Sequence, residues 1–171
     1  INMAEKELAV ENLRVVFARD GGEYTAVNGI SYHLNTGETL AIVGESGCGK
    51  TVSALSILRL IPPPGRITSG RIRFDSRDIL SLSQIELREL RGNKIAMIFQ
   101  EPMTSLNPVF TVGDQITETL LRHTPLTRRE AWQKAVALLR RVDISSPEQK
   151  MDAYPHQLSG GMRQRVMIAI A

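Results

Sequence analysis

Residues 44–51 constrain the fold more than any other part of the chain. Their sequence, GESGCGKT, places Gly, four variable residues and then Gly-Lys-Thr in order. Residues 39–43 (TLAIV) before it are an apolar run typical of a buried strand, and residues 52–60 (VSALSILRL) after it are typical of a helix. The pattern therefore predicts a glycine-rich loop between a strand and a helix, with backbone N–H groups that bind phosphate.

Each residue type in this loop has a chemical reason to be there. Glycines let the backbone approach phosphates without a clash at Cβ. Lys50 is expected to reach the β- and γ-phosphates and to act in catalysis, and the Thr51 hydroxyl is expected to ligate Mg²⁺. A chance glycine turn is the alternative, and the flanking strand and helix argue against it. The predicted nucleotide-binding residues are Gly44, Glu45, Ser46, Gly47, Cys48, Gly49, Lys50 and Thr51.

Composition excludes several other classes of protein. The net charge is only +3, and the basic residues are spread along the chain, so we expect no nucleic-acid partner. Cys48 is the single cysteine, which excludes an internal disulfide. No apolar run approaches the length that spans a bilayer. We therefore expect a protein that is soluble or peripheral to a membrane through a partner.

Hydrophobic periodicity predicts the other elements. Two strands, residues 8–17 and 24–34, are expected to be joined by a turn at Asp20-Gly21-Gly22. Residues 95–99 (IAMIF) resemble a second buried strand. Further predictions are a strand at residues 70–74 and helices at residues 84–90, 112–121, 128–142 and from 160 to the end.

Residues 158–166 (LSGGMRQRV) form a second candidate anion site. The Ser159 hydroxyl and the backbone N–H groups of Gly160 and Gly161 lie where a helix is expected to begin. Taken alone, the segment is equally well explained as an ordinary Ser N-cap. Together with residues 44–51, it resembles the signature motif of ATP-binding-cassette proteins, which generic phosphate-loop enzymes lack.

This resemblance covers nearly the whole chain and implies a fold. We expect an α/β, phosphate-loop cassette with a mixed β-sheet subdomain and phosphate-loop core at about residues 4–100 and an α-helical subdomain at about residues 101–171 that ends in the signature helix. Members of the family bind ATP and Mg²⁺ and pack head to tail. The resemblance therefore implies that Ser159, Gly160 and Gly161 contact the nucleotide of a second subunit.

Two further residues are carried over from the resemblance. Gln100, at the end of residues 95–99, matches the glutamine that approaches Mg²⁺ and the attacking water in the family. Phe17 lies where the family places an aromatic side chain that stacks on adenine. Tyr24 is the rival for this role, and both residues also fit ordinary positions in a sheet.

The narrower resemblance rests on residues 99–108 (FQEPMTSLNP), which look like the peptide-importer branch. That branch takes up dipeptides, oligopeptides, nickel complexes or glutathione. It implies an ATPase subunit on the cytoplasmic side of the bacterial inner membrane. The implied partners are a second ATPase subunit, transmembrane permease subunits and, indirectly, a periplasmic solute-binding protein.

The family also needs an apolar strand that ends in Asp-Glu, and a switch histidine. Asp75 and Asp143 follow segments that do not complete the acidic pattern, and His33, His123 and His156 stand elsewhere than the switch position. We therefore expect the chain to be the N-terminal part of one cassette. On this interpretation it binds nucleotide without hydrolysing ATP at a useful rate by itself.

Two other classes remain as alternatives. One is a cassette protein without a transporter, which would act on nucleic acid or the ribosome; residues 101–108 (EPMTSLNP) and the absence of a basic stripe argue against it. The other is an unrelated phosphate-loop kinase or GTPase, and residues 158–166 argue against that class.

Overall fold

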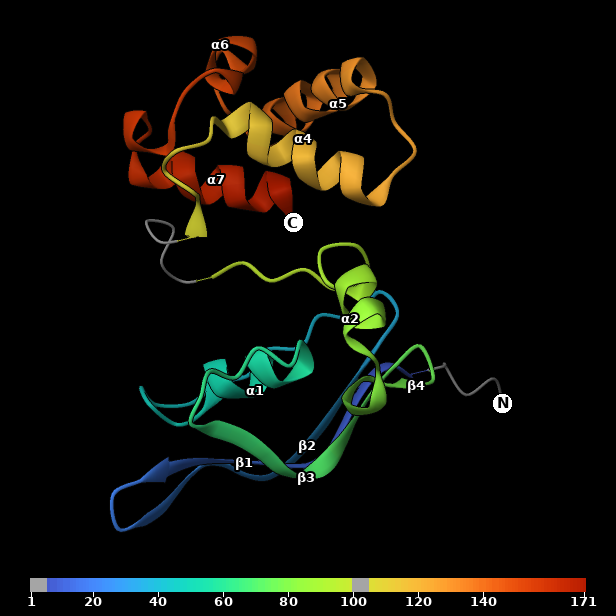
Figure 1. The fold of residues 1–171 in the computed structure, drawn as a ribbon, viewed down its shortest axis with the longest axis vertical. Coiled ribbons are helices and arrows are strands. Elements are labelled where there is room, and N and C mark those ends of the chain that lie inside the picture. Colours follow the sequence, from blue (N-terminus) through green and yellow to red (C-terminus); the bar gives the residue numbers. More distant parts are fainter. Residues whose placement is uncertain (1–5, 100–104) are drawn as a thin grey trace. The chain divides into compact units, whose positions relative to one another are not determined.

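The computed structural model describes residues 6–99 and 105–171. The chain divides into two compact units, Ile1–Arg88 and Glu89–Ala171. The first unit contains the sheet and the phosphate loop, and the second contains a group of helices (Figure 1). Gln100, one of the predicted site residues, lies outside the described residues.

The first unit is built on a four-stranded antiparallel sheet with the strand order β2-β1-β3-β4. The strands are β1 (Lys6–Arg19), β2 (Gly22–Asn35), β3 (Gly65–Phe74) and β4 (Arg77–Asp78). The predicted hairpin between the first two strands is confirmed, and each strand is longer than the sequence pattern indicated. Gly21, with φ of 92°, supplies the left-handed conformation that this tight turn requires.

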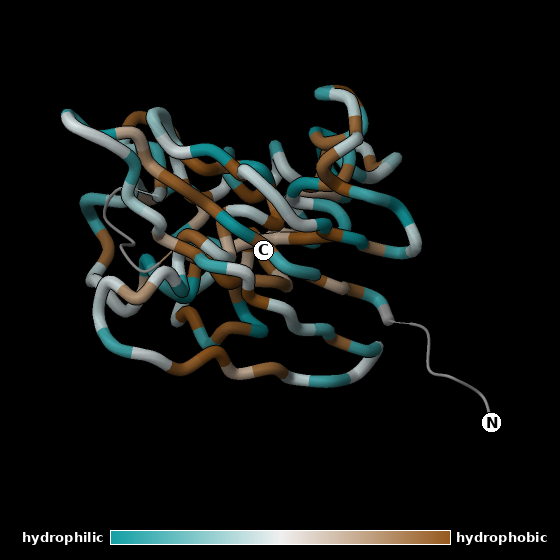
Figure 2. The backbone as a smooth tube through the Cα atoms, turned by 90° about the horizontal axis from the view of Figure 1, so that it is seen from below, coloured by the Kyte–Doolittle hydropathy of each residue, from teal (hydrophilic) through white to brown (hydrophobic). Residues whose placement is uncertain are grey.

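Short helices complete the first unit. They are α1 (Lys50–Ile57), the 3₁₀ turn η1 (Ile79–Ser81) and α2 (Gln84–Leu90). The division between the two units falls within α2, between Arg88 and Glu89. Hydrophobic and hydrophilic stretches alternate along the backbone (Figure 2). The side chains that become fully buried are mainly β-branched or leucine, because few aromatic residues are present to fill this core; they include Val10, Leu13, Val15, Ile72 and Ile79.

The second unit packs its helices around one apolar core. Its elements are α4 (Val112–His123), α5 (Arg128–Arg141), α6 (Pro147–Met151), the 3₁₀ turn η2 (Pro155–Gln157) and α7 (Gly160–Ile170). The helices predicted at residues 112–121 and 128–142 are confirmed within two residues at each end. Leu139 and Met151 are fully buried at the centre of the core, and Ala135 lets the helices approach closely.

Capping boxes explain why α4 and α5 begin where they do. The Thr127 hydroxyl accepts a hydrogen bond from the backbone N–H of Glu130, and the Glu130 carboxylate accepts one from the backbone N–H of Thr127. Thr111 and Asp114 form the same reciprocal pair at the start of α4. Each pair satisfies backbone donors that a helix terminus otherwise leaves unpaired.

Two predicted strands are wrong. Residues 39–43 form no strand, and Val43 is 91% exposed, whereas the apolar run predicted a buried strand. Residues 95–99 make only an isolated bridge between Ile95 and Arg91. An apolar run becomes a strand only when another strand supplies hydrogen-bond partners along its length, and neither run belongs to a sheet ladder in the described part of the chain.

We predict that Leu139→Ala strongly destabilises the helical unit. Leu139 is completely buried, so its truncation leaves a cavity and costs about 2–5 kcal/mol of unfolding free energy. Leu121→Ala is the matched control, because Leu121 is 38% exposed and should lose much less. Urea unfolding followed by circular dichroism measures both, and equal losses would contradict this account of the core.

The Glu130 capping box makes part of the stability depend on pH. Hydrogen bonds from Thr127 hold the pKa of the Glu130 carboxyl below its ordinary value of 4.5. A carboxyl whose pKa is lowered in the folded state stabilises that state above its unfolded pKa, and this stabilisation is lost as the pH falls. Glu130→Gln keeps the cap without a titrating group. We therefore expect its melting temperature to fall less than that of the wild type between about pH 5 and pH 3.

Candidate functional site

The predicted phosphate loop curls around the side chain of Lys50. Its ammonium donates hydrogen bonds to the carbonyl oxygens of Gly44, at 2.5 Å, and Glu45, at 2.7 Å. The Cys48 sulfur lies 3.5 Å from the same nitrogen. Lys50 is also the first residue of α1, so its charge stands at the helix N-terminus. Cation and helix terminus together form the kind of site that attracts an anion.

Close backbone packing attaches this loop to the sheet. Gly49 caps α1 with φ of 94°, and a Cβ atom there would lie 2.3 Å from the carbonyl oxygen of Ala26 in β2. One turn further along α1, the buried Ser53 hydroxyl lies 3.0 Å from the hydroxyl of Tyr32, also in β2. Burial raises the pKa of the Tyr32 phenol, which therefore remains a neutral hydrogen-bonding partner. These two contacts position the start of α1 against the hairpin.

A cavity of about 540 Å³ lies beside the loop, within the first unit. Five of the predicted nucleotide-binding residues line it, namely Phe17, Gly47, Gly49, Lys50 and Thr51. Lys50 and Thr51 supply an ammonium and a hydroxyl, and Phe17 supplies an apolar ring. The cavity therefore combines groups for anionic phosphates with an aromatic surface for a base.

The two candidate aromatic residues line this cavity together. Phe17 and Tyr24 are Cα partners across the β1–β2 pair. The Phe17 ring packs against the backbone of Gly65, where a Cβ atom would lie 2.5 Å from its Cε1 atom. The guanidinium of Arg19 lies over the Tyr24 ring, with its Cζ atom 4.7 Å from the ring centroid. Which ring stacks on a base stays a prediction.

Sequence reasoning missed Arg19, Ala26 and Pro64, which also line the cavity. Arg19 could have been predicted from strand alternation. It stands two residues after Phe17, so its side chain faces the same side of the sheet. No comparable signal marks Ala26 or Pro64, since their positions depend on where α1 and β3 lie against the hairpin.

The residues predicted from the second motif belong to the helical unit. Ser159 caps α7, and its hydroxyl accepts a hydrogen bond from the backbone N–H of Met162 at 3.3 Å. Ser159, Gly160 and Gly161 are all exposed. A Cβ atom at either glycine would meet no described atom within 4 Å. Neither packing nor a clash therefore requires glycine here, although glycine weakens a helix by about 1 kcal/mol relative to alanine.

The described residues contain neither a cluster of metal-binding side chains nor a membrane-spanning helix. No group of three or more His, Cys, Asp or Glu side chains in residues 6–99 and 105–171 could hold a metal ion. Thr51 remains the described oxygen donor that the phosphate-loop pattern assigns to Mg²⁺. Within the same residues, we find no helix with the length and apolar character to cross a membrane.

The site and its setting define a phosphate-loop nucleotide-binding cassette. In the first unit, the phosphate loop places Lys50 at a helix N-terminus beside an aromatic-lined cavity. The second unit separately has an exposed Ser-Gly-Gly helix start. Residues 27–171 match the family model described as ABC transporter, and the chain belongs to that family.

Relatives named as transport or import ATP-binding proteins match nearly the whole chain. It is 51% identical over 168 residues to the dipeptide transport ATP-binding protein DppD of Bacillus subtilis, covering 98% of this chain and 50% of that protein. It is 51% identical over 170 residues to the glutathione import ATP-binding protein GsiA of Shigella dysenteriae serotype 1, covering 96% of this chain and 27% of that protein. The chain thus spans about half the length of DppD, or less for GsiA.

Solved structures agree with the predicted fold class. A dimeric ATP-binding cassette in a post-hydrolysis state, bound to ADP and Pi, superposes with a TM-score of 0.84 at 25% identity and covers 95% of this chain and 68% of that chain. A Clostridium perfringens cassette, part of the cbiONQ ABC transporter complex, gives a TM-score of 0.71 at 28% identity, covering 96% of this chain and 60% of that chain. The predicted α/β cassette fold is confirmed.

We predict that Gly49→Ala disturbs the loop more than Gly47→Ala. Both glycines have positive φ, so both substitutions introduce backbone strain of about 1 kcal/mol or more. Only at Gly49 would the new Cβ also collide with the Ala26 carbonyl, so α1 must move away from β2. Thermal unfolding of the two variants measures the difference. Equal melting temperatures would show that the contact with Ala26 does not hold the loop.

Proposed function

We propose that this chain is the ATP-binding part of an importer subunit that couples ATP binding and hydrolysis to uptake of peptides or related small solutes. The observation that carries the proposal is the cavity that brings Phe17 together with Lys50 and Thr51. Membership of the ABC transporter family and the similarity to dipeptide and glutathione importers support it.

In this proposal, each described residue of the cavity contacts one part of the nucleotide. Lys50 neutralises charge on the β- and γ-phosphates, and it exchanges its present carbonyl partners for phosphate oxygens as they enter. Backbone N–H groups at the start of α1 bind phosphate in the same place. Phe17, whose ring is backed by Gly65, supports the base. Bound Mg²⁺ supplies further charge compensation, with Thr51 as a ligand and Gln100 as the second predicted one.

A second ATPase subunit completes the site in this proposal. Ser159, Gly160 and Gly161 then donate hydrogen bonds to the γ-phosphate of a nucleotide held by the other chain. Their exposure and the lack of any packing reason for the two glycines support this role. A solved relative of 25% identity is described as a dimer with bound ADP and Pi, which also supports it.

The transport partners follow from the same family. We propose that the protein works on the cytoplasmic side of the bacterial inner membrane, attached to transmembrane permease subunits and indirectly served by a periplasmic solute-binding protein. The solute class is a dipeptide, oligopeptide, glutathione or nickel complex. Relatives named for dipeptide, oligopeptide and glutathione transport, each about half identical to this chain, support the class.

We predict that Lys50→Ala weakens ATP binding by about 10- to 100-fold, since it removes a charge-assisted hydrogen bond to phosphate. Isothermal titration calorimetry with ATP and Mg²⁺ measures the dissociation constants. Lys94→Ala is the control, because Lys94 is exposed and lies in the other unit. We expect binding without robust turnover, as the 171 residues contain no apolar run that ends in Asp-Glu. Rapid hydrolysis that survives Lys50→Ala would overturn the proposal.

A further inference from the structure

We propose that Arg19, held on the ring of Tyr24, is a second base-contacting residue of the cavity and adds affinity for a nucleotide over a free polyphosphate. This inference rests on the proposed function, because it assigns the base end of the same site. We call the pair formed by Arg19 and Tyr24 the Arg19–Tyr24 wall.

Strand register places this wall next to Phe17. Phe17 pairs with Tyr24 across β1 and β2, and the register continues regularly to the pair of Arg19 and Gly22. Side chains two residues apart on a strand, and those of directly paired residues, point to the same face of a sheet. Phe17, Arg19 and Tyr24 accordingly line the same cavity. The guanidinium thus stands beside the aromatic surface assigned to the base.

The tyrosine ring, and no carboxylate, holds the arginine. The Arg19 Cζ atom is 4.7 Å from the Tyr24 ring centroid, within the range of a cation–π interaction. The nearest acidic residue of β2, Glu23, is instead bonded to Arg66 of β3. Within residues 6–99 and 105–171, Arg19 takes part in no ion pair. No ion pair in the described part of the chain therefore neutralises its charge.

A guanidinium binds phosphates as well as the faces and acceptor atoms of bases, and its place in this cavity, beside the aromatic rings, favours the base. It is planar and weakly hydrated, it stacks on π faces, and its N–H groups donate to ring nitrogens. The contact with the Tyr24 ring restrains the Arg19 side chain, so less side-chain entropy is lost when a ligand binds. The phosphate end of the cavity already has Lys50 and Thr51. The Arg19–Tyr24 wall therefore supplies affinity that a nucleotide gains and a free polyphosphate does not.

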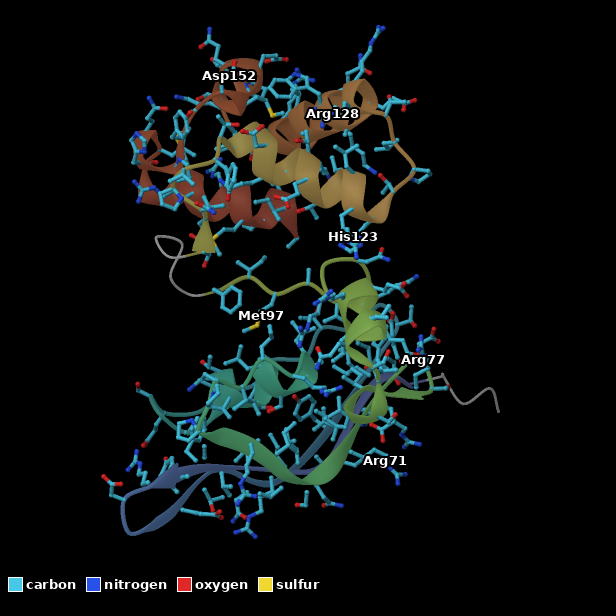
Figure 3. The ribbon with its side chains drawn as sticks, viewed as in Figure 1. Arg71, Arg77, Met97, His123, Arg128 and Asp152 are labelled. Atoms are coloured by element: carbon cyan, nitrogen blue, oxygen red, sulfur yellow. The ribbon has the colours of Figure 1, made fainter. Side chains whose placement is uncertain are left out.

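The test compares ATP with inorganic tripolyphosphate, each with Mg²⁺, on the full chain by calorimetry. Arg19→Ala and Tyr24→Leu remove the wall, whereas Tyr24→Phe keeps the ring. Arg71→Ala is the matched control for charge, because Arg71 is an exposed arginine of β3, on the same sheet (Figure 3). We expect Arg19→Ala and Tyr24→Leu to weaken ATP binding by about 3- to 10-fold with tripolyphosphate affinity unchanged.

Tyr24→Phe keeps the ring and should therefore weaken ATP binding less than Tyr24→Leu, and Arg71→Ala should bind ATP like the wild type. The proposal is overturned if Arg19→Ala binds ATP as tightly as the wild type, or if ATP and tripolyphosphate lose the same factor, since the latter indicates a general effect of charge or folding. Failure of the proposed function has a different signature. In that case the wild type does not bind ATP, or Lys50→Ala binds it unchanged, whatever the Arg19 variants do.

Discussion

The contact between Gly49 and the Ala26 carbonyl underlies the arrangement of the first unit. No side chain can stand between α1 and β2 at this point, because a Cβ atom would lie 2.3 Å from that oxygen. The distance from the phosphate loop to the hairpin is consequently a backbone-to-backbone distance, and close packing keeps such distances nearly constant. Phe17 belongs to the same hairpin. The contact between α1 and β2 therefore also sets the position of Phe17 relative to the phosphate loop.

The hydrogen bond between Tyr32 and Ser53 adds direction to that contact. A single close approach would leave α1 free to swing about it, whereas a second contact one turn along the helix limits its orientation. The orientation matters because the N-terminal N–H groups of α1 act on an anion only along the helix axis. The helix of eight residues is too short to form stably alone, so these contacts also stabilise it.

The second unit depends on different physics. Helices α4 and α5 begin at capping boxes, which are local devices, and the helices of this unit pack around fully buried aliphatic side chains. The start of α7 differs, because packing does not require its two glycines. Ser159 caps the helix, yet the following two glycines fill no gap and give up helical stability. Small residues that packing does not require leave backbone N–H groups open to a ligand, and this agrees with the proposed role of the segment.

Local chemistry carried most of the sequence-based prediction. The hairpin, the helix predicted at residues 128–142 and the phosphate loop each depend on neighbouring residues. They depend, respectively, on a glycine turn after Asp20, apolar side chains at helical spacing, and the spacing of Gly49 and Lys50. The fold class followed from two such segments, residues 44–51 and 158–166, because their resemblance to one family is specific. The assignment of solute class depended on residues 99–108, of which 100–104 lie outside the described residues.

The features that the sequence did not predict depend on contacts between residues that are distant in the sequence. Residues 39–43 and 95–99 have the composition of buried strands, but composition cannot supply the neighbouring strand that a ladder needs. Arg19 appears in the sequence as an ordinary charged residue near a turn. The hairpin register sets it beside Phe17, and the Tyr24 ring gives its guanidinium a partner. Sequence alone thus identified the groups proposed to bind phosphate, since one continuous loop contains them. Only the tertiary structure brought together the Arg19–Tyr24 wall, because its parts meet through pairing between strands.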